Sequence, residues 1–208
     1  MRAPTAGRAT VAGVLLTGGA STRMGADKSL LEVDGVPMGA RLGAMLAGAV
    51  TGPLLEVGPG HSGLPAVADD APGAGPLAAL ATAARALTGW AGPTVVLACD
   101  LPRCSAAVVD LLARWPGDGA VLPVIGGRRQ PLCARWAAAD LAAAVRLAAA
   151  GKRSLRGLPG AGECARLTED DLPTSVPPGD LADADTPEEL AAAGVAVFTP
   201  TGSGRGAR

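Results

Sequence analysis

The sequence predicts an α/β protein with a mostly parallel central sheet. Short apolar runs, typical of buried strands, alternate with longer segments whose apolar residues recur at helical spacing. Strands that alternate with helices in this way pair in parallel and are covered by helices on both faces. Ligands of such sheets bind at the carboxyl ends of the strands. The apolar runs are residues 11–16, 53–57, 94–98 and 120–124.

Four segments between or after these runs are predicted to be helices. Pro76 suits the first turn of the second helix, Ser105 is placed to cap the third, and Gly151 ends the fourth. The apolar faces consist of Met38, Leu42, Met45, Leu46 and Ala49; Leu77, Leu80, Ala84 and Leu87; Val108, Leu111, Leu112 and Trp115; and Leu141, Val145 and Ala148.

The alternation changes after residue 121. Residues 120–124, the pair Gly126-Gly127 and residues 131–136 predict a hairpin, and we place the second-substrate half of the site there. Arg128 and Arg129, beside the glycine pair, are expected to be solvated, and His61 is expected at the surface.

Composition favours one domain with a real core. The 208 residues are 49% hydrophobic but only 2% aromatic, so alanine, leucine and valine must build the core. Residues 10–198 are expected to form the domain, with residues 1–9 and 199–208 as disordered tails. The formal net charge of −1 disfavours nucleic-acid binding, and no apolar stretch is long enough to span a membrane.

The cysteines disfavour a zinc site. Cys99, Cys104, Cys133 and Cys164 contain no C-x-x-C pair, and the chain has a single histidine. Buried free thiols in a reducing cytoplasm are the better interpretation.

The most specific motif is the loop that follows the first apolar run. Gly18 and Gly19 are followed by Arg23, Gly25 and Lys28. Glycines let backbone N–H groups approach phosphates, and the two cations neutralise phosphate charge. The spacing fits neither a Walker A loop nor a dinucleotide fingerprint. The alternative is a glycine-rich turn with solvated charges, which the grouping of Arg23 and Lys28 after a buried strand makes less favourable. The motif therefore predicts a triphosphate site.

A second motif places a carboxylate directly after the apolar run 94–98. In the order Cys99-Asp100-Leu101-Pro102, Asp100 follows a buried strand and would lie beside the phosphates. Mg²⁺ prefers one or two carboxylates together with phosphate oxygens, so Asp100 is the candidate metal ligand. The alternative is that Asp100 caps the following turn or helix.

Three further segments carry charges whose role the pattern leaves open. Asp69 and Asp70 open a Gly/Pro-rich loop and could contact a base or ribose, or be solvated. Thr186, Pro187 and Glu189 form a capping box, which leaves Asp183 and Asp185 unexplained; these could be polar contacts or a second metal ligand. The basic segment 151–156 either favours the helix dipole or binds a phosphate of the second substrate through Arg153 and Arg156.

Taken together, these residues resemble the molybdenum cofactor guanylyltransferase family, within the wider NTP-transferase superfamily. The resemblance extends in order from about residue 12 to about residue 193. It covers residues 16–28, Leu30-Leu31, Gly35, Pro37, Gly75-Pro76-Leu77, residues 99–102, Gln130-Pro131-Leu132 and residues 185–188.

The resemblance implies a Rossmann-like three-layer fold and a cytoplasmic enzyme that transfers GMP from Mg-GTP to molybdopterin and releases pyrophosphate. Gly18, where cytidylyltransferase relatives usually have alanine, and Cys99 favour guanine. Asp183 and Asp185 stand where related sequences often carry asparagine. A molybdoenzyme or its chaperone would be a further partner.

The resemblance also implies roles for individual residues. Leu16, Thr17 and Gly18 would contact the nucleotide through backbone; Lys28 would hold its phosphates; Asp69, or its neighbour Asp70, would contact guanosine; Asp100 would bind Mg²⁺; and Asp183 and Asp185 would lie on the pterin side. The charge and glycine pattern, rather than the resemblance, adds Gly19 and Arg23 to the phosphate contacts and Arg153 and Arg156 to the pterin side.

Two other functions fit the same residues. One is a related cytidylyl- or guanylyltransferase acting on another small phosphate, such as molybdopterin with CTP, or phospholactate. The other is a non-catalytic nucleotide-binding module that delivers cofactor to a partner enzyme, although passive binding does not need the metal carboxylate Asp100.

Overall fold

The computed structural model describes residues 10–18, 27–159, 164–184 and 186–192. The helices are α1 (Met38–Ala49), α2 (Pro76–Ala86), α3 (Ala106–Ala113), α4 (Ala138–Ala149) and α5 (Pro187–Ala192), with 3₁₀ turns at Lys28–Leu30, Leu155–Gly157, Glu169–Asp171 and Pro178–Leu181. The strands are β1 (Ala12–Leu16), β2 (Glu32–Val33), β3 (Val36–Pro37), β4 (Leu54–Val57), β5 (Ala66–Val67), β6 (Thr94–Ala98), β7 (Ala120–Ile125), β8 (Arg128–Arg129), β9 (Cys133–Trp136) and β10 (Cys164–Leu167).

One central sheet has the strand order β10-β7-β9-β6-β1-β4-β5, and β8 pairs with β7. Strand β1 pairs in parallel with both β4 and β6, so that Leu16 lies opposite Val57 on one side and Ala98 on the other. The loops that follow these three strands therefore leave the same edge of the sheet. The predicted mostly parallel α/β architecture is confirmed, and this shared edge is where such sheets bind ligands.

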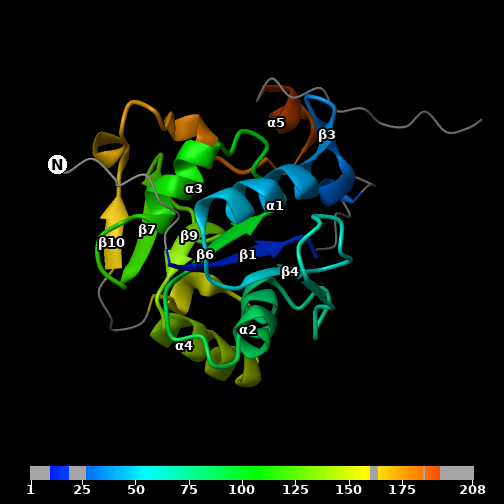
Figure 1. Ribbon diagram of the computed structural model, residues 1–208, viewed down its shortest axis with the longest axis vertical. Helices are drawn as coiled ribbons and strands as arrows, with labels where there is room; N and C mark the ends of the chain where they lie inside the picture. The colour runs from blue at the N-terminus through cyan, green and yellow to red at the C-terminus, as the bar shows by residue number, and fades with distance from the viewer. Residues whose placement is uncertain (1–9, 19–26, 160–163, 185, 193–208) are drawn as a thin grey trace, which may run out of the picture.

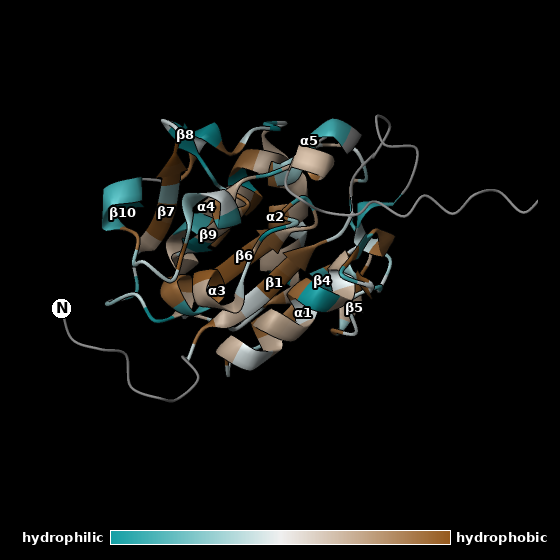
Figure 2. Ribbon diagram, turned by 90° about the horizontal axis from the view of Figure 1, so that it is seen from above, coloured by the Kyte–Doolittle hydropathy of each residue, from teal (hydrophilic) through white to brown (hydrophobic). Residues whose placement is uncertain are grey.

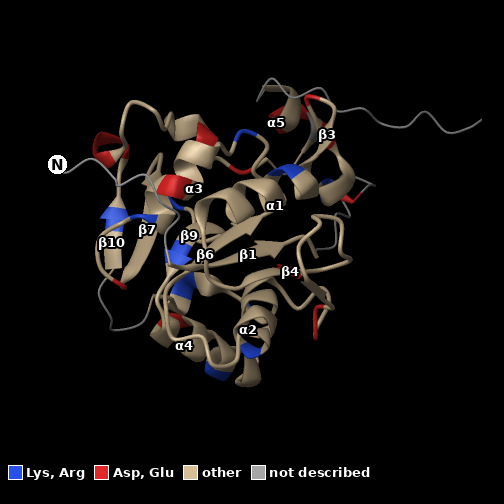
Figure 3. Cartoon of the chain, viewed as in Figure 1, with Lys and Arg blue, Asp and Glu red and all other residues tan. Residues whose placement is uncertain are grey.

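Helices cover both faces of the sheet. Figure 1 shows α1 and α3 on one face and α2 and α4 on the other. Every residue of β1 and of β6 is buried, because both strands lie in the middle of the sheet between the two helical layers. Figure 2 shows these strands mostly in hydrophobic colours, whereas β8 at the periphery is hydrophilic. Figure 3 likewise shows β1 and β6 without charged residues.

The predicted helices form with close to their expected bounds. Pro76 occupies the first helical position of α2, and Gly151 follows α4 with φ of +74°. Ser105 stands at the N-cap of α3, but its side chain makes no capping hydrogen bond, so this part of the prediction is wrong. Trp115 lies beyond the end of α3 and packs against the core from the following turn.

The region after residue 121 forms the predicted hairpin and then departs from the parallel pattern. β7 and β8 are antiparallel around Gly126-Gly127. The chain then returns as β9, which is inserted antiparallel to β6 and also pairs with β7. β9 thus runs back toward the edge of the sheet opposite the ligand-binding edge.

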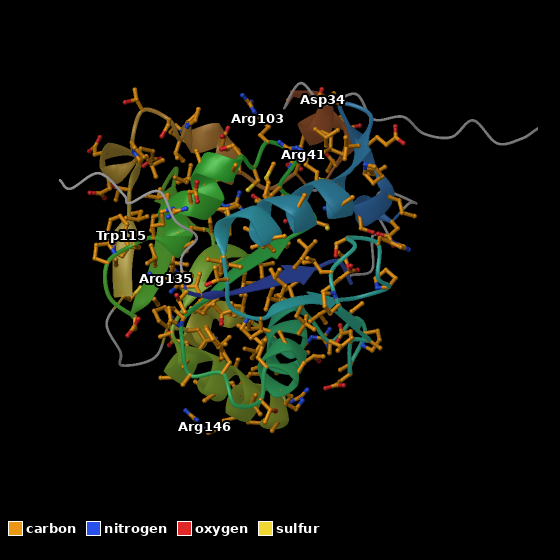
Figure 4. The ribbon with its side chains drawn as sticks, viewed as in Figure 1. Asp34, Arg41, Arg103, Trp115, Arg135 and Arg146 are labelled. Carbon is orange, nitrogen blue, oxygen red and sulfur yellow. The ribbon has the colours of Figure 1, made fainter. Side chains whose placement is uncertain are left out.

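A buried arginine holds that opposite edge together. Arg135 of β9 is 1% exposed. Its guanidinium donates to the carbonyl oxygens of Trp115 at 2.6 Å, Gly117 at 2.9 Å and Gly119 at 2.9 and 3.1 Å. Figure 4 shows Arg135 and Trp115 at the same end of the molecule. Because these carbonyls belong to the turn between α3 and β7, Arg135 fixes the path of that turn.

Among the residues that the structure describes, no helix combines the length and apolarity needed to cross a membrane.

Candidate active site

A cleft of about 330 Å³ opens at the carboxyl edge of the sheet, and we call it the edge cleft. The residues that line it come from the ends of β1 and β6, the loop before α2 and the start of α2, the 3₁₀ turn Lys28–Leu30 and the approach to β9. They are Leu16, Thr17, Gly18, Lys28, Asp69, Gly73, Gly75, Pro76, Ala79, Ala98, Cys99, Asp100 and Leu132. The cleft continues past Gly18, Asp69 and Gly73 into a neighbouring hollow beside Gly58 and Pro59.

Lys28 and Asp100 line the same cleft and are tied to one another through one residue. The Lys28 ammonium donates to the carbonyl oxygen of Ala184 at 2.9 Å, and the amide of Ala184 donates to the carbonyl oxygen of Asp100 at 2.7 Å. The segment before α5 thus spans the two sides of the cleft. In one crevice, the ammonium group can contact the phosphate oxygens of a polyphosphate, and the carboxylate can bind the metal ion that accompanies it.

The structure distinguishes the two neighbouring aspartates. Asp69 lines the edge cleft, and its carboxylate accepts from the amide of Ala71 at 3.0 Å. Asp70 is exposed and forms an ion pair with Arg85 of α2 at 2.7 Å. Asp69 is therefore the residue of this pair that can contact a ligand in the cleft.

Comparison with known proteins identifies the family. The model of the MobA-like NTP transferase domain matches residues 13–164. The chain belongs to the MobA-like NTP transferase family. A molybdenum cofactor guanylyltransferase from Xanthomonas euvesicatoria pv. vesicatoria is 32% identical over 181 residues, which cover 85% of this chain and 90% of that protein.

A second relative agrees with this assignment, and a solved structure shows the same fold. A probable molybdenum cofactor guanylyltransferase from Chloroflexus aggregans is 34% identical over 158 residues, 70% of this chain and 74% of that protein. The crystal structure of molybdopterin-guanine dinucleotide biosynthesis protein A from Archaeoglobus fulgidus has the same fold, with a TM-score of 0.71 at 18% identity over 88% of this chain and 96% of that one. The protein is thus an enzyme of the nucleotidyltransferase class.

Several residues expected in the site of this MobA-like protein lie elsewhere or outside the described residues. Gly19, Arg23, Asp185 and both predicted tails fall outside them. Asp183 is exposed and does not line the edge cleft, so its predicted contact with the site is not seen. The capping box beside it is confirmed, because Thr186 and Glu189 exchange side-chain-to-amide hydrogen bonds at 3.0 and 3.2 Å.

The basic segment 151–156 lies against the rim of the edge cleft rather than inside it. Arg153 is exposed and donates to the carbonyl oxygen of Gly73 at 2.6 Å. Arg156 lines a second groove of about 360 Å³ together with Arg128 and Arg129, and we call it the arginine groove. Pro76 and Leu132 line both spaces, so the groove adjoins the edge cleft. Arg128 and Arg129 are exposed, as expected. Arg129 also donates to the carbonyl oxygens of Leu158 and Arg156, each at 3.3 Å.

Two carboxylates line the edge cleft; Asp100 is the candidate metal ligand, and Asp69 is the candidate contact for the nucleoside. The described part of the chain contains no group of three or more histidine, cysteine and acidic residues that could enclose a metal ion. Asp100 lines the cleft, and its Oδ1 atom is buried. One hard oxygen ligand together with phosphate oxygens suits Mg²⁺, which retains much of its hydration, and does not suit zinc.

The cysteines are all free thiols, as predicted. Cys99 lines the edge cleft and is 5% exposed. Burial, reinforced by the charge of Asp100, raises the pKa of the Cys99 thiol far above its ordinary value of 9.0. Cys99 therefore stays a neutral, apolar part of the cleft wall rather than a nucleophile.

Sequence reasoning missed a buried carboxylate behind the cleft. Glu56 of β4 has no exposed surface. Burial alone raises its pKa, but hydrogen bonds from Ser62, Thr17 and Gly60 outweigh burial and lower the pKa from 4.5 to about 2. The only signal in the sequence is an acidic residue inside an otherwise apolar strand, Leu-Leu-Glu-Val.

Glu56 should make the folded protein acid-sensitive. Because its pKa is lower in the folded state, its contribution to stability is complete above about pH 4.5 and is lost as the pH falls toward 2. Between pH 6 and pH 3 this loss amounts to about 2 kcal/mol of the free energy of unfolding. Urea unfolding at both pH values measures it, and the Glu56→Gln variant should show a pH dependence smaller by that amount. Equal pH dependence in both proteins would contradict the assignment.

Proposed function

We propose that this protein transfers GMP from GTP to molybdopterin and releases pyrophosphate. The observation that carries the proposal is the convergence of Lys28, Asp69 and Asp100 on one cleft at the carboxyl ends of β1 and β6. The names of the relatives support the choice of donor and acceptor, since they are molybdenum cofactor guanylyltransferases.

In the proposed reaction an oxygen of the molybdopterin phosphate attacks the α-phosphorus of GTP. The bond between the α- and β-phosphates breaks, and the electron pair leaves with pyrophosphate. The acceptor phosphate is already an anion at neutral pH, so the cleft does not need a general base. The work of the protein is to align two polyanions and to stabilise charge on the leaving group.

The chain's own residues have separable tasks in this proposal. Lys28 neutralises the phosphates while Ala184 orients its ammonium group. Backbone at Leu16, Thr17 and Gly18 contacts the nucleotide, and Asp69 accepts hydrogen bonds from its guanosine part. Asp100 would hold Mg²⁺, which supplies charge neutralisation of the triphosphate when bound. Arg156 of the arginine groove and Arg153 at the rim would lie on the side of the acceptor.

Such an enzyme would act in the cytoplasm, and its product would be passed to a molybdoenzyme or to a chaperone of one.

The direct test is pyrophosphate release from Mg-GTP or Mg-CTP, each with and without molybdopterin. The proposal predicts release only with GTP and molybdopterin together. Release with CTP instead of GTP would indicate a cytidylyltransferase. A further assay replaces molybdopterin with phospholactate, and release with phospholactate but not with molybdopterin would indicate another acceptor. GTP binding without release under any of these conditions would favour a non-catalytic delivery module.

Replacement of Lys28 should impair handling of the triphosphate. The Lys28→Met variant keeps most of the apolar stem but loses the charge, so kcat/KM for GTP should fall on the order of 10²-fold. Initial rates at varied GTP concentration measure the effect. Arg85→Met, which removes a cation outside the cleft, is the matched control. Equal kinetics in the two variants would exclude Lys28 from the phosphate site.

A further inference from the structure

Glu56 lies behind the edge cleft without lining it. Its place in β4 is opposite Leu15 of β1, two residues before the loop that carries the glycine pair. The side chain is fully buried, yet its pKa is lowered, because several donors form hydrogen bonds to the carboxylate. A buried carboxylate is costly unless its hydrogen-bonding capacity is satisfied, so its surroundings must be built around it.

The first group of donors belongs to the outgoing arm of the glycine-rich loop, which we define as Thr17 and Gly18. The Thr17 hydroxyl donates to Oε1 of Glu56 at 2.5 Å. The amides of Thr17 and Gly18 donate to the carbonyl oxygen of Val57, the next residue of the same strand, at 3.1 and 3.2 Å. This arm is therefore attached to β4 through side chain and backbone together.

Close approach at this point depends on a glycine. Gly58 has φ of +152°, and a Cβ atom there would collide with the Thr17 hydroxyl and lie 2.9 Å from the amide nitrogen of Gly18. The absence of a side chain at residue 58 thus lets the outgoing arm pack against the end of β4.

The second group of donors belongs to residues 60–62. The amides of Gly60 and His61 donate to Oε1 of Glu56 at 2.8 and 3.1 Å. The amide and hydroxyl of Ser62 donate to Oε2 at 2.8 and 2.5 Å. Glu56 thereby closes this turn around its own carboxylate, much as an anion is held in a nest of backbone amides.

That turn holds the returning arm of the loop, which we define as Asp27, Lys28 and Ser29. Nδ1 of His61 lies 2.9 Å from the Ser29 hydroxyl and 3.5 Å from Oδ2 of Asp27. The Ser29 hydroxyl and amide both donate to Oδ1 of Asp27, at 2.7 and 2.9 Å. His61 is partly exposed, as expected of a surface residue, but its ring also contacts the residues on both sides of Lys28.

We infer that Glu56 is a positioning residue that fixes the outgoing and returning arms relative to one another, so that Thr17, Gly18 and Lys28 are preorganised for a nucleoside triphosphate. Thr17 connects the carboxylate to the outgoing arm, and the turn 60–62 connects it through His61 to the returning arm beside Lys28. The ligand class rests on the proposed function, whereas the mechanical link between the arms does not. Glu56 does not touch the ligand; it acts through Thr17 and His61.

The mechanical link is tested first by residue-resolved amide hydrogen exchange on the unliganded protein. In Glu56→Gln, the side-chain amide cannot accept from all the donors that now meet the carboxylate. The amides of Thr17, Gly18 and Ser29 should therefore exchange at least about tenfold faster. Asp140→Asn is the matched control: Asp140 is also a buried carboxylate, but it accepts from Ala137 at the start of α4, near the edge opposite the cleft. Faster exchange at the outgoing arm alone, or equal changes in both variants, would overturn the inference.

The consequence for the ligand is tested by the affinity for GTP with Mg²⁺, measured calorimetrically without acceptor. Glu56→Gln should weaken binding about tenfold, while KM for molybdopterin at saturating GTP changes much less. A role in general stability alone would instead lower the melting temperature of Glu56→Gln and Asp140→Asn alike and leave both GTP affinities as in the wild type, which would overturn the inference.

A second pair of variants keeps the test decisive if Glu56→Gln does not fold. Thr17→Val removes the hydroxyl with little change in shape, and Thr17→Ser restores it. Valine should weaken GTP binding and speed exchange at Gly18, and serine should recover most of both losses. Identical behaviour of valine and serine would refute the link. Failure of the proposed function would appear differently, as wild-type protein that releases no pyrophosphate while the exchange effects persist.

Discussion

The Asp100→Asn variant is expected to lose about 10²–10³-fold in kcat while keeping its fold, by analogy with the removal of one preorganised electrostatic group from an active site. Asn has nearly the shape of Asp, so packing at the end of β6 should be retained. What is lost is the negative charge that would hold the divalent ion beside the triphosphate. Steady-state rates of pyrophosphate release at saturating GTP and varied Mg²⁺ measure the effect.

The control for this variant is Asp110→Asn, which neutralises an aspartate paired with Arg114 on α3, outside the cleft. Its turnover should remain within about twofold of the wild type, because Asp110 lies outside the edge cleft and a partly exposed ion pair contributes little to stability. Near-normal Mg²⁺-dependent turnover in Asp100→Asn would show that the metal ligand lies elsewhere.

The Arg135→Met variant is expected to lose about 3 kcal/mol or more of the free energy of unfolding. The guanidinium donates to three backbone carbonyl oxygens in the turn between α3 and β7, and methionine can satisfy none of them. Hydrogen bonds from a charged donor contribute about 1.5–3 kcal/mol each, and buried carbonyls left without a donor add a further penalty. Burial lowers the pKa of Arg135 below its ordinary value, but an arginine side chain is not deprotonated in proteins at neutral pH.

Chemical denaturation measures this loss, with Arg146→Met on the exposed side of α4 as control. The control should lie within about 0.5 kcal/mol of the wild type. If the two variants had the same midpoint, the guanidinium would not be holding the turn, and the hydrogen bonds at the far edge of the sheet would contribute no net stability.

The main strands and helices could be predicted from the sequence because each has apolar residues at a regular spacing and a capping or turn residue near its end. β6 has the predicted bounds, and α1 begins and ends where its apolar face does. The pairing of β9 with β6 could not be predicted, since the apolar pattern of Cys133–Trp136 and its place in a hairpin do not show which further strand it joins. The strands β2, β3, β5 and β8 have two residues each, which is too short for a periodic apolar pattern, so only their pairing with other strands shows that they are strands.

The candidate site was predictable where motif residues directly follow strands. Gly18 after β1 and Asp100 after β6 reach one cleft because parallel strands end at the same edge. The choice between Asp69 and Asp70 needed the structure, since only the packing of Arg85 shows which of them faces away from the cleft. The roles of Glu56 and His61 were missed because their partners are backbone amides or side chains 6 to 39 residues distant in sequence, which no local motif records.

The central claim is that one cleft, between Lys28, Asp69 and Asp100, binds the nucleotide. The most direct measurement is a crystal structure of the protein with GTP and Mg²⁺. The account predicts the triphosphate between Lys28 and Asp100, with the nucleoside extending toward Asp69 along the Gly73–Gly75 loop. GTP bound in the arginine groove, or anywhere that leaves Lys28 and Asp100 without contact to the nucleotide or its ion, would contradict it.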